Sequence, residues 1–199
     1  MKSESASVLE DLRSALRPAS VAQVGGFRPG VDPLTSWFLK GVSLAGEGLP
    51  VWKGKPMFPL LQIRIDELPV IPEQLKEIAL LVLFHNMESH PFDQPHGEGW
   101  LIREYATLEG LELLPEVATP YREFPVRWLS VNDDAPGWED AWDILDLSAV
   151  NDDEPASDSF FEDFNRYGGT KVGGYPMEIQ HGVGLQDFVF QVGSEEKVN

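Results

Sequence analysis

The chain has 199 residues, of which 42% are hydrophobic, including six Trp and eleven Phe. This length fits one domain or two closely packed halves, and the composition supplies enough apolar surface for a substantial core. Cysteine is absent, which excludes disulfides, thiolate zinc sites and a cysteine nucleophile and suits a reducing cytosol. Thirty-three acids against 15 bases give a net charge of −18, which argues against binding to nucleic acid through its phosphates.

An apolar stripe at helical spacing predicts an N-terminal helix within residues 1–19, capped by Ser7 and ended by Pro18. The stripe consists of Val8, Leu9, Leu12, Ala15 and Leu16. The start of the chain is acidic and amphipathic, unlike a signal peptide, and the longest apolar run, residues 78–84, is too short to span a bilayer. We therefore expect a soluble, cytoplasmic protein that does not bind membranes.

A loop-rich region punctuated by glycine and proline follows this helix, and aromatic or β-branched runs then predict strands. The expected strands are 57–65, 78–84, 100–105, 125–131 and 187–192. Short helices are expected at 73–77, 136–145 and 159–166, and a loop at 86–99. Strands and helices without a regular alternation indicate an α+β fold, in which a few short helices pack on mostly antiparallel sheets.

The segment YGGTKVGGYPMEIQ, residues 167–180, has the glycines and lysine of a phosphate-binding loop. A Walker-type loop, however, places lysine directly after its last glycine and before Ser or Thr, at the start of a helix. Here Lys171 precedes Gly173 and Gly174, and Pro176 follows almost at once. The sequence therefore predicts a turn with two glycines at positive φ between extended segments.

An internal echo suggests a duplication with two related halves, at about 20–130 and 131–199. The tetrapeptide VGGF at 24–27 resembles VGGY at 172–175, and each is followed by an aromatic-rich strand that contains a glutamine. The interval from the second glycine to the glutamine is longer in the first copy, from Gly26 to Gln62, than in the second copy, from Gly174 to Gln191. The pattern is therefore that of two diverged copies, with insertions in the first, rather than a regular array.

Three histidines in one loop region, His85, His90 and His96, are the weak candidates for a metal site. Their spacing matches neither helix nor strand periodicity, and there is no HExxH motif or cysteine partner. No GxSxG elbow marks a nucleophilic serine. Carboxylate pairs are too abundant to identify a general acid and base. We expect no cofactor, no bound metal and no catalytic residues.

The negative charge is concentrated between Trp128 and Asn165, a stretch with twelve acids and neither Lys nor Arg. An ordinary solvated face explains such a stretch, and a calcium loop at 152–154 lacks the alternating ligand order. The remaining interpretation is a docking surface for a basic protein, with interleaved aromatic residues as anchors although most of them should face the core. The candidate partner-binding residues are Asp133, Asp134, Glu139, Asp140, Asp143, Asp152, Asp153, Glu154 and Asp158.

KVGGYPMEIQ at 171–180, followed by FVFQVGSEE at 188–196, resembles the second-half signature of the YwqG-like family, domain of unknown function 1963. The first half is also similar, in GLPVWKGKPMFPLLQIRIDELP at 48–69, LLVLFHN at 80–86 and GWLIREYATLEGL at 99–111. The resemblance covers residues 20–199 as one domain made of two halves. It also implies closing strands beyond Asn199, so the second half is expected to be shortened.

The resemblance implies an α+β fold with two related halves and carries no established chemistry. Some members of that family look like immunity proteins that neutralise bacterial toxins. This analogy, together with the acidic charge, favours a cytoplasmic protein that blocks a basic toxin such as a nuclease effector. The alternatives are an uncharacterised enzyme, or a small-ligand or metal-binding protein with a cleft between its halves, and a scaffold protein.

Overall fold

The computed structural model describes residues 3–28, 30–86, 88, 94–117, 121–177 and 188–194. The chain forms two compact units, each assembled from segments that are distant in sequence. Unit 1 consists of Met1–Val21, Pro69–Pro72 and Leu129–Gly193, and unit 2 of Ala22–Leu68, Glu73–Trp128 and Ser194–Asn199. The division falls within two strands, β1 (Arg17–Val24) and β10 (Phe124–Asp134).

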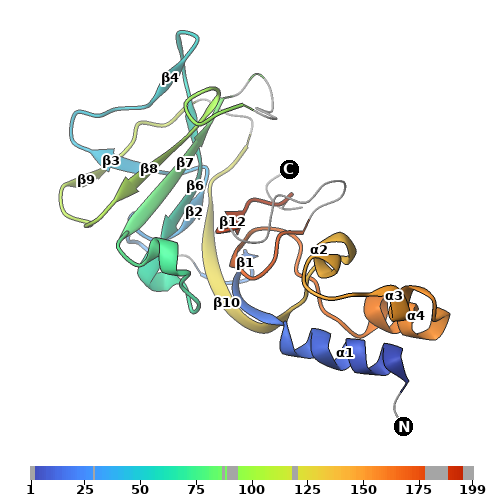
Figure 1. Cartoon of the computed structure of the whole chain (residues 1–199). Helices are drawn as coiled ribbons and strands as arrows, with labels where there is room; N and C mark the ends of the chain where they lie inside the picture. The colour runs from blue at the N-terminus through green and yellow to red at the C-terminus, as the bar shows by residue number, and fades with distance from the viewer. Residues whose placement is uncertain are drawn as a thin grey trace. The chain divides into compact units, whose positions relative to one another are not determined.

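Unit 2 is built around an antiparallel sheet with the strand order β10-β2-β6-β7-β8 (Figure 1). The first part of β10 pairs with β2 (Trp37–Phe38), and β6 (Phe58–Arg64), β7 (Leu80–His85) and β8 (Trp100–Tyr105) follow in that order. The first five residues of β7 are all buried, which explains why this apolar run occupies the interior of the sheet. Two short 3-10 helices, η1 (Ile65–Glu67) and η2 (Glu73–Leu75), lie between β6 and β7.

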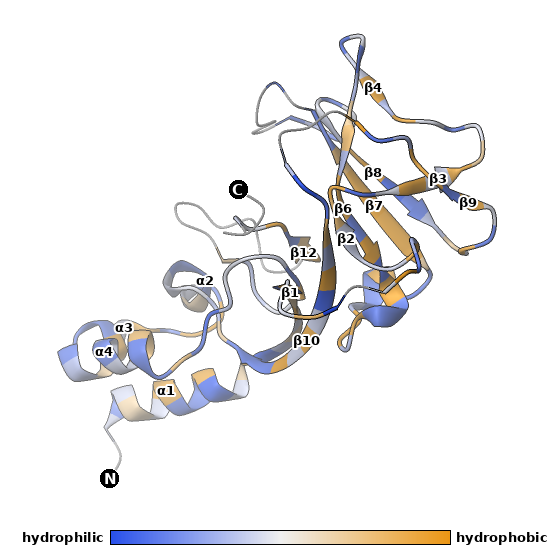
Figure 2. Ribbon diagram, turned by 180° about the vertical axis from the view of Figure 1, so that it is seen from behind, coloured by the Kyte–Doolittle hydropathy of each residue, from blue (hydrophilic) through white to orange (hydrophobic). Residues whose placement is uncertain are grey.

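Two small antiparallel ladders complete unit 2. β3 (Val42–Leu44) pairs with β9 (Leu111–Leu113), and β4 (Val51–Trp52) pairs with β5 (Lys55–Pro56). A hydrophobic cluster connects the first ladder to the central sheet and consists of Val42, Met57, Leu80, Val82, Phe84 and Tyr105. Hydrophobic residues accordingly colour β6 and β7 orange in Figure 2.

The described residues of unit 1 form four helices and a small antiparallel sheet. The helices are α1 (Glu4–Ser14), α2 (Trp138–Trp142), α3 (Ser148–Asn151) and α4 (Glu154–Glu162). In the sheet, β1 pairs with β11 (Lys171–Gly173), which pairs with β12 (Phe190–Gln191). Helices this short are marginal alone, so their stability comes from a shared core of Leu9, Leu12, Ala135, Ala141, Leu147, Val150, Ala156, Phe160 and Phe164.

The predicted α+β fold with mostly antiparallel sheets is confirmed. The strands expected at 57–65, 78–84, 100–105 and 125–131 correspond to β6, β7, β8 and β10. Of the strand expected at 187–192, only β12 is formed among the described residues. The helix expected at 73–77 is the 3-10 helix η2. None of the helices in the described ranges is both long and apolar enough to cross a membrane.

The N-terminal helix differs from the prediction at both ends. Ser3, rather than Ser7, caps α1, because its hydroxyl oxygen accepts the Ala6 N–H. The helix ends at Ser14, and Pro18 lies inside β1 instead of ending a helix. The predicted apolar stripe nevertheless faces the core, with Leu9 and Leu12 buried.

The helices of the acidic segment have different bounds from those predicted. The helix predicted at 159–166 begins at Glu154, since Pro155 sits in its first turn, where the missing N–H costs nothing and φ is already helical. The helix predicted at 136–145 is limited to α2, and the four-residue α3 was not expected.

The two glycine pairs share a backbone conformation, but an internal duplication is not shown. The φ angles of Gly25 and Gly26 are 74° and 77°, and those of Gly173 and Gly174 are 75° and 74°. The predicted positive-φ turn after Lys171 is therefore confirmed. The strands that carry the two glutamines differ, because β6 has seven residues and β12 has two.

Candidate functional site

The acids predicted to form one docking surface divide by exposure. Glu139, Asp143, Asp152, Glu154 and Asp158 are exposed, and Asp133 and Asp153 are half-buried. In contrast, Asp134 is 0% exposed and Asp140 only 6% exposed. The prediction that these last two face a partner is therefore wrong, because neither side chain is accessible at the surface of unit 1.

Asp134 is the centre of a buried hydrogen-bond network. The Lys171 ammonium donates to its Oδ2 at 2.7 Å, and the backbone N–H of Tyr175 donates to the same oxygen at 2.8 Å. The backbone N–H of Tyr167 donates to Oδ1 at 3.1 Å. Burial lowers the pKa of Lys171, and the hydrogen bond to Asp134 opposes that shift. This carboxylate therefore holds β10, β11 and the segments on either side of β11 together.

This network explains Lys171 and Gly174 in the segment 167–177. Lys171 serves as the counter-ion of Asp134, so the ammonium is not available to a phosphate. A Cβ on Gly174 would lie 2.1 Å from Asp134 Oδ2, and the φ of this residue is positive. Glycine is required here both by the conformation and by the close approach of the carboxylate.

Two half-buried acids also have internal partners. Asp133 accepts hydrogen bonds from the Asn165 amide at 2.6 Å and the Tyr167 hydroxyl at 2.9 Å, and these bonds lower its pKa. Asp153 accepts a hydrogen bond from the Ser5 hydroxyl at 2.6 Å, which ties α4 to α1. Both acids therefore stabilise unit 1, whatever else their exposed atoms contact.

The exposed acids have no neutralising partner within the described part of the chain, where no salt bridge reaches them. The nearest following cation, Arg166, turns inward instead. Its guanidinium donates to the carbonyl oxygens of Pro136 and Phe160 and lies 4.4 Å from the Phe160 ring centre. Burial lowers the pKa of Arg166. The helical surface of unit 1 therefore keeps its negative charge.

Two large aromatic side chains emerge among these acids. Trp142 is 39% exposed and Phe161 is 56% exposed. Each contacts Trp138, with ring centres 6.1 Å apart for Trp142 and 5.5 Å apart for the stacked Phe161. We call Trp138, Trp142 and Phe161 the aromatic patch. The sequence assigned most of these aromatic residues to the core; Phe160 and Phe164 are buried there and Trp138 packs against them, whereas Trp142 and Phe161 are exposed.

The histidine site is not assembled by the described residues, among which no group of three His, Cys, Asp or Glu could hold a metal. The His85 ring packs against Phe58, with ring centres 5.7 Å apart. His96 Nε2 accepts the backbone N–H of Ile102 at 2.9 Å, which is a structural role at strand β8. The third candidate, His90, lies outside the described residues.

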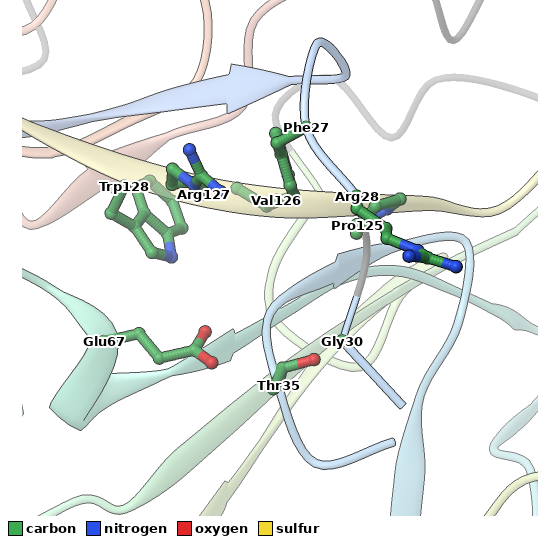
Figure 3. Close-up of a pocket in the computed structure, with 9 residues that line it drawn as sticks. All are labelled: Phe27, Arg28, Gly30, Thr35, Glu67, Pro125, Val126, Arg127 and Trp128. Carbon is green, nitrogen blue, oxygen red and sulfur yellow. The ribbon is translucent and has the colours of Figure 1, made fainter. Parts of the chain in front are cut away.

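A cavity of about 330 Å³ lies within unit 2, between the turn after β1, η1 and β10. We call it the β10 pocket; it is lined by Phe27, Arg28, Gly30, Thr35, Glu67, Pro125, Val126, Arg127 and Trp128. Figure 3 shows Phe27 and Arg127 at strand β10, with Trp128, Glu67 and Thr35 on the other side of this strand in the view. No pattern in the sequence indicates this pocket, because its lining comes from four separate segments without a shared spacing.

Ser36, which is fully buried, positions two walls of the β10 pocket. Its backbone N–H donates to Glu67 Oε2 at 2.8 Å, and its hydroxyl oxygen accepts the Trp128 indole N–H at 2.9 Å. The carboxylate and the indole are therefore held in place before any ligand arrives. Glu67 Oε1 has no hydrogen-bond partner among the described residues and remains available as an acceptor.

The cations of the β10 pocket have no ion-pair partner among the described residues. Within the described ranges, neither Arg28 nor Arg127 forms a salt bridge. The guanidinium of Arg127 lies over the Phe27 ring, 4.4 Å from its centre. The pocket thus combines two aromatic side chains, a carboxylate oxygen and two exposed cations in a protein whose net charge is −18.

No protein-family model matches the chain, and no curated protein matches its sequence.

Proposed function

We propose that this chain is a cytoplasmic acidic binding protein of the YwqG-like family, which neutralises a basic bacterial toxin such as a secreted nuclease. The protein acts by occluding the active or DNA-binding surface of the toxin. The observation that carries this proposal is the aromatic patch of Trp138, Trp142 and Phe161 surrounded by unneutralised acids.

The chemistry of this surface supports a protein partner. Exposed Trp and Phe side chains provide the apolar contacts that dominate binding energy at interfaces, where a few aromatic anchors carry most of the affinity. The surrounding acids include Glu139 and Asp143 on the α2 side and Asp158 on α4. Their field attracts a basic surface and accelerates encounter in a salt-dependent way. A nuclease has such a surface, because its cleft binds phosphates.

The test uses the product of the reading frame adjacent to this gene as the partner, measured by size-exclusion chromatography and stopped-flow association. We expect a stable complex, inhibition of the partner's activity, and an association rate that falls as salt is raised. Replacing Asp152, Glu154 and Asp158 by Lys should slow association by about ten-fold to a thousand-fold. Asp153 is left intact in this variant, since its bond to Ser5 supports the fold.

The matched control changes the same number of charges in unit 2. Glu104, Glu109 and Glu112 are exposed and lie outside the proposed surface, so their replacement by Lys should retain most of the association rate. Equal slowing by both triple variants would show that net charge alone matters and would contradict the assigned surface. An adjacent product that is not basic, or that forms no complex, would contradict the proposed function itself.

A further inference from the structure

The β10 pocket is separate from the surface assigned above, since all its lining residues belong to unit 2. We infer that it binds a nucleoside 5′-monophosphate, whose base carries an exocyclic amino group. This inference goes beyond the proposed toxin blockade and does not depend on it.

The size of the pocket sets the first limit on the ligand. A cavity of about 330 Å³ lies at the lower end of the range for small-molecule sites, which begins at about 300 Å³. This volume suits one base, one sugar and one phosphate, and it does not suit a dinucleotide. The aromatic side chains of Phe27 and Trp128 provide apolar surface for a flat ring.

The charges of the pocket set the second limit. Arg28 and Arg127 both line the pocket, and a guanidinium offers planar donors that match the oxygens of a phosphate. The net charge of −18 repels anions from the molecule as a whole. Saturable binding of a phosphate compound would therefore report the cations that line the pocket rather than general electrostatic attraction.

Glu67 sets the third limit, on the base. Its Oε2 accepts the Ser36 N–H, while Oε1 accepts no hydrogen bond from the described residues. The Thr35 hydroxyl is already engaged, because it donates to the Asp32 carbonyl and accepts the Trp37 indole N–H. The open polar position is consequently an acceptor, and it pairs with the amino group of adenine, guanine or cytosine. Uracil is disfavoured, since two carbonyl oxygens flank its single N–H and the carboxylate repels them.

Calorimetric titration of the full chain at low salt tests this inference with AMP, GMP, CMP and UMP as ligands, together with adenosine and inorganic phosphate. We expect saturable binding of at least one amino-bearing monophosphate in the micromolar to low-millimolar range, at least about ten-fold tighter than UMP. Adenosine should bind at least about ten-fold more weakly than AMP, because it lacks the group that the arginines recognise.

Three variants locate the site. Arg127→Gln should weaken monophosphate binding by about ten-fold or more. Arg122→Gln is the matched control, since Arg122 is also exposed in unit 2 but does not line the pocket, and its affinity should change less than about two-fold. Glu67→Gln keeps an oxygen for the Ser36 N–H and presents an amide donor, so it should narrow or reverse the preference for AMP, GMP or CMP over UMP.

The reversal of base preference is a result that loss of structure cannot produce. No saturable binding at low-millimolar nucleotide would overturn the inference. Binding that Arg127→Gln and Glu67→Gln leave unchanged would overturn it as well. Binding of inorganic phosphate alone, with the same affinity as the monophosphates, would show a simple anion site and would also contradict it.

Discussion

Two sets of acids in unit 1 have the same chemistry but opposite surroundings. Asp134 is fully buried and accepts three hydrogen bonds, one of them from a buried lysine, whereas Asp152, Glu154 and Asp158 are exposed without an ion-pair partner in the described structure. Both sets fall within the same lysine-free, arginine-free stretch of sequence. The difference shows that local charge density does not reveal which acids hold the fold and which face solvent.

The largest expected effect comes from Lys171→Met, which leaves the buried Asp134 carboxylate without its counter-ion. Loss of one partner of such a pair destabilises a protein by about 3–5 kcal/mol. Urea unfolding monitored by circular dichroism measures this loss. Lys76→Met is the control, because the Lys76–Glu73 pair is exposed and contributes at most about 1 kcal/mol. Equal losses in the two variants would remove the distinction between buried and exposed charge.

Two adjacent phenylalanines on α4 allow the same comparison between a buried and an exposed side chain for apolar groups. Phe160→Ala should cost about 3–5 kcal/mol of unfolding free energy, because Phe160 is completely buried. Phe161→Ala should cost less than about 1 kcal/mol, yet weaken partner binding by more than about 1 kcal/mol. Thermal unfolding and partner titration of both variants test this. A Phe161→Ala variant that binds normally would remove the aromatic patch from the interface.

One substitution in each glycine pair distinguishes the cost of a positive φ from the cost of a steric clash. Gly174→Ala combines a positive φ with the clash against Asp134 and should destabilise by about 2–4 kcal/mol. Gly26→Ala has the same φ but an ordinary 3.7 Å contact to Gln23, so about 1–2 kcal/mol is expected. Chemical denaturation compares the two. A loss for Gly26→Ala as large as that for Gly174→Ala would show that conformation alone requires both glycines.

The smallest expected effect concerns the loss of folding stability at low pH. Hydrogen bonds from Asn165 and Tyr167 lower the pKa of Asp133 in the folded state. The resulting stabilisation is present above its ordinary pKa of about 4 and is lost as the pH falls through the lower folded-state value. Because Asp133 is partly exposed, Asp133→Asn should remove less than about 1 kcal/mol at neutral pH. Unfolding curves from pH 2 to pH 7 should converge for the two proteins at the acid end.

The sequence predicted the fold class and the main strands because these depend on runs of apolar residues, such as the buried run of β7. It predicted the glycine turn because glycine readily adopts a positive φ, which such turns require. It did not predict that Asp134 is buried, because the partners of that carboxylate follow it by 33 to 41 residues. It also missed the exposure of Phe161, since helical periodicity places neighbouring positions only approximately.

The β10 pocket could not be predicted from the sequence for a related reason. Arg28, Glu67 and Arg127 belong to segments that only the folded chain brings together. Each of these residue types is common at protein surfaces, and no local pattern distinguishes these copies. Only the shared hydrogen bonds of Ser36 show that the pocket is a fixed arrangement.

The hydrogen bond from the Tyr175 hydroxyl to the Ala15 carbonyl joins residues that are 160 positions apart. During synthesis, the N-terminal helix emerges first, but Tyr175 leaves the ribosome only after every segment of unit 2 up to Trp128 has been made. Unit 2 can therefore fold while unit 1 still lacks its last elements. Helix α1 is the first element to be synthesised and one of the last to reach its final contacts, so its apolar face is exposed during most of translation.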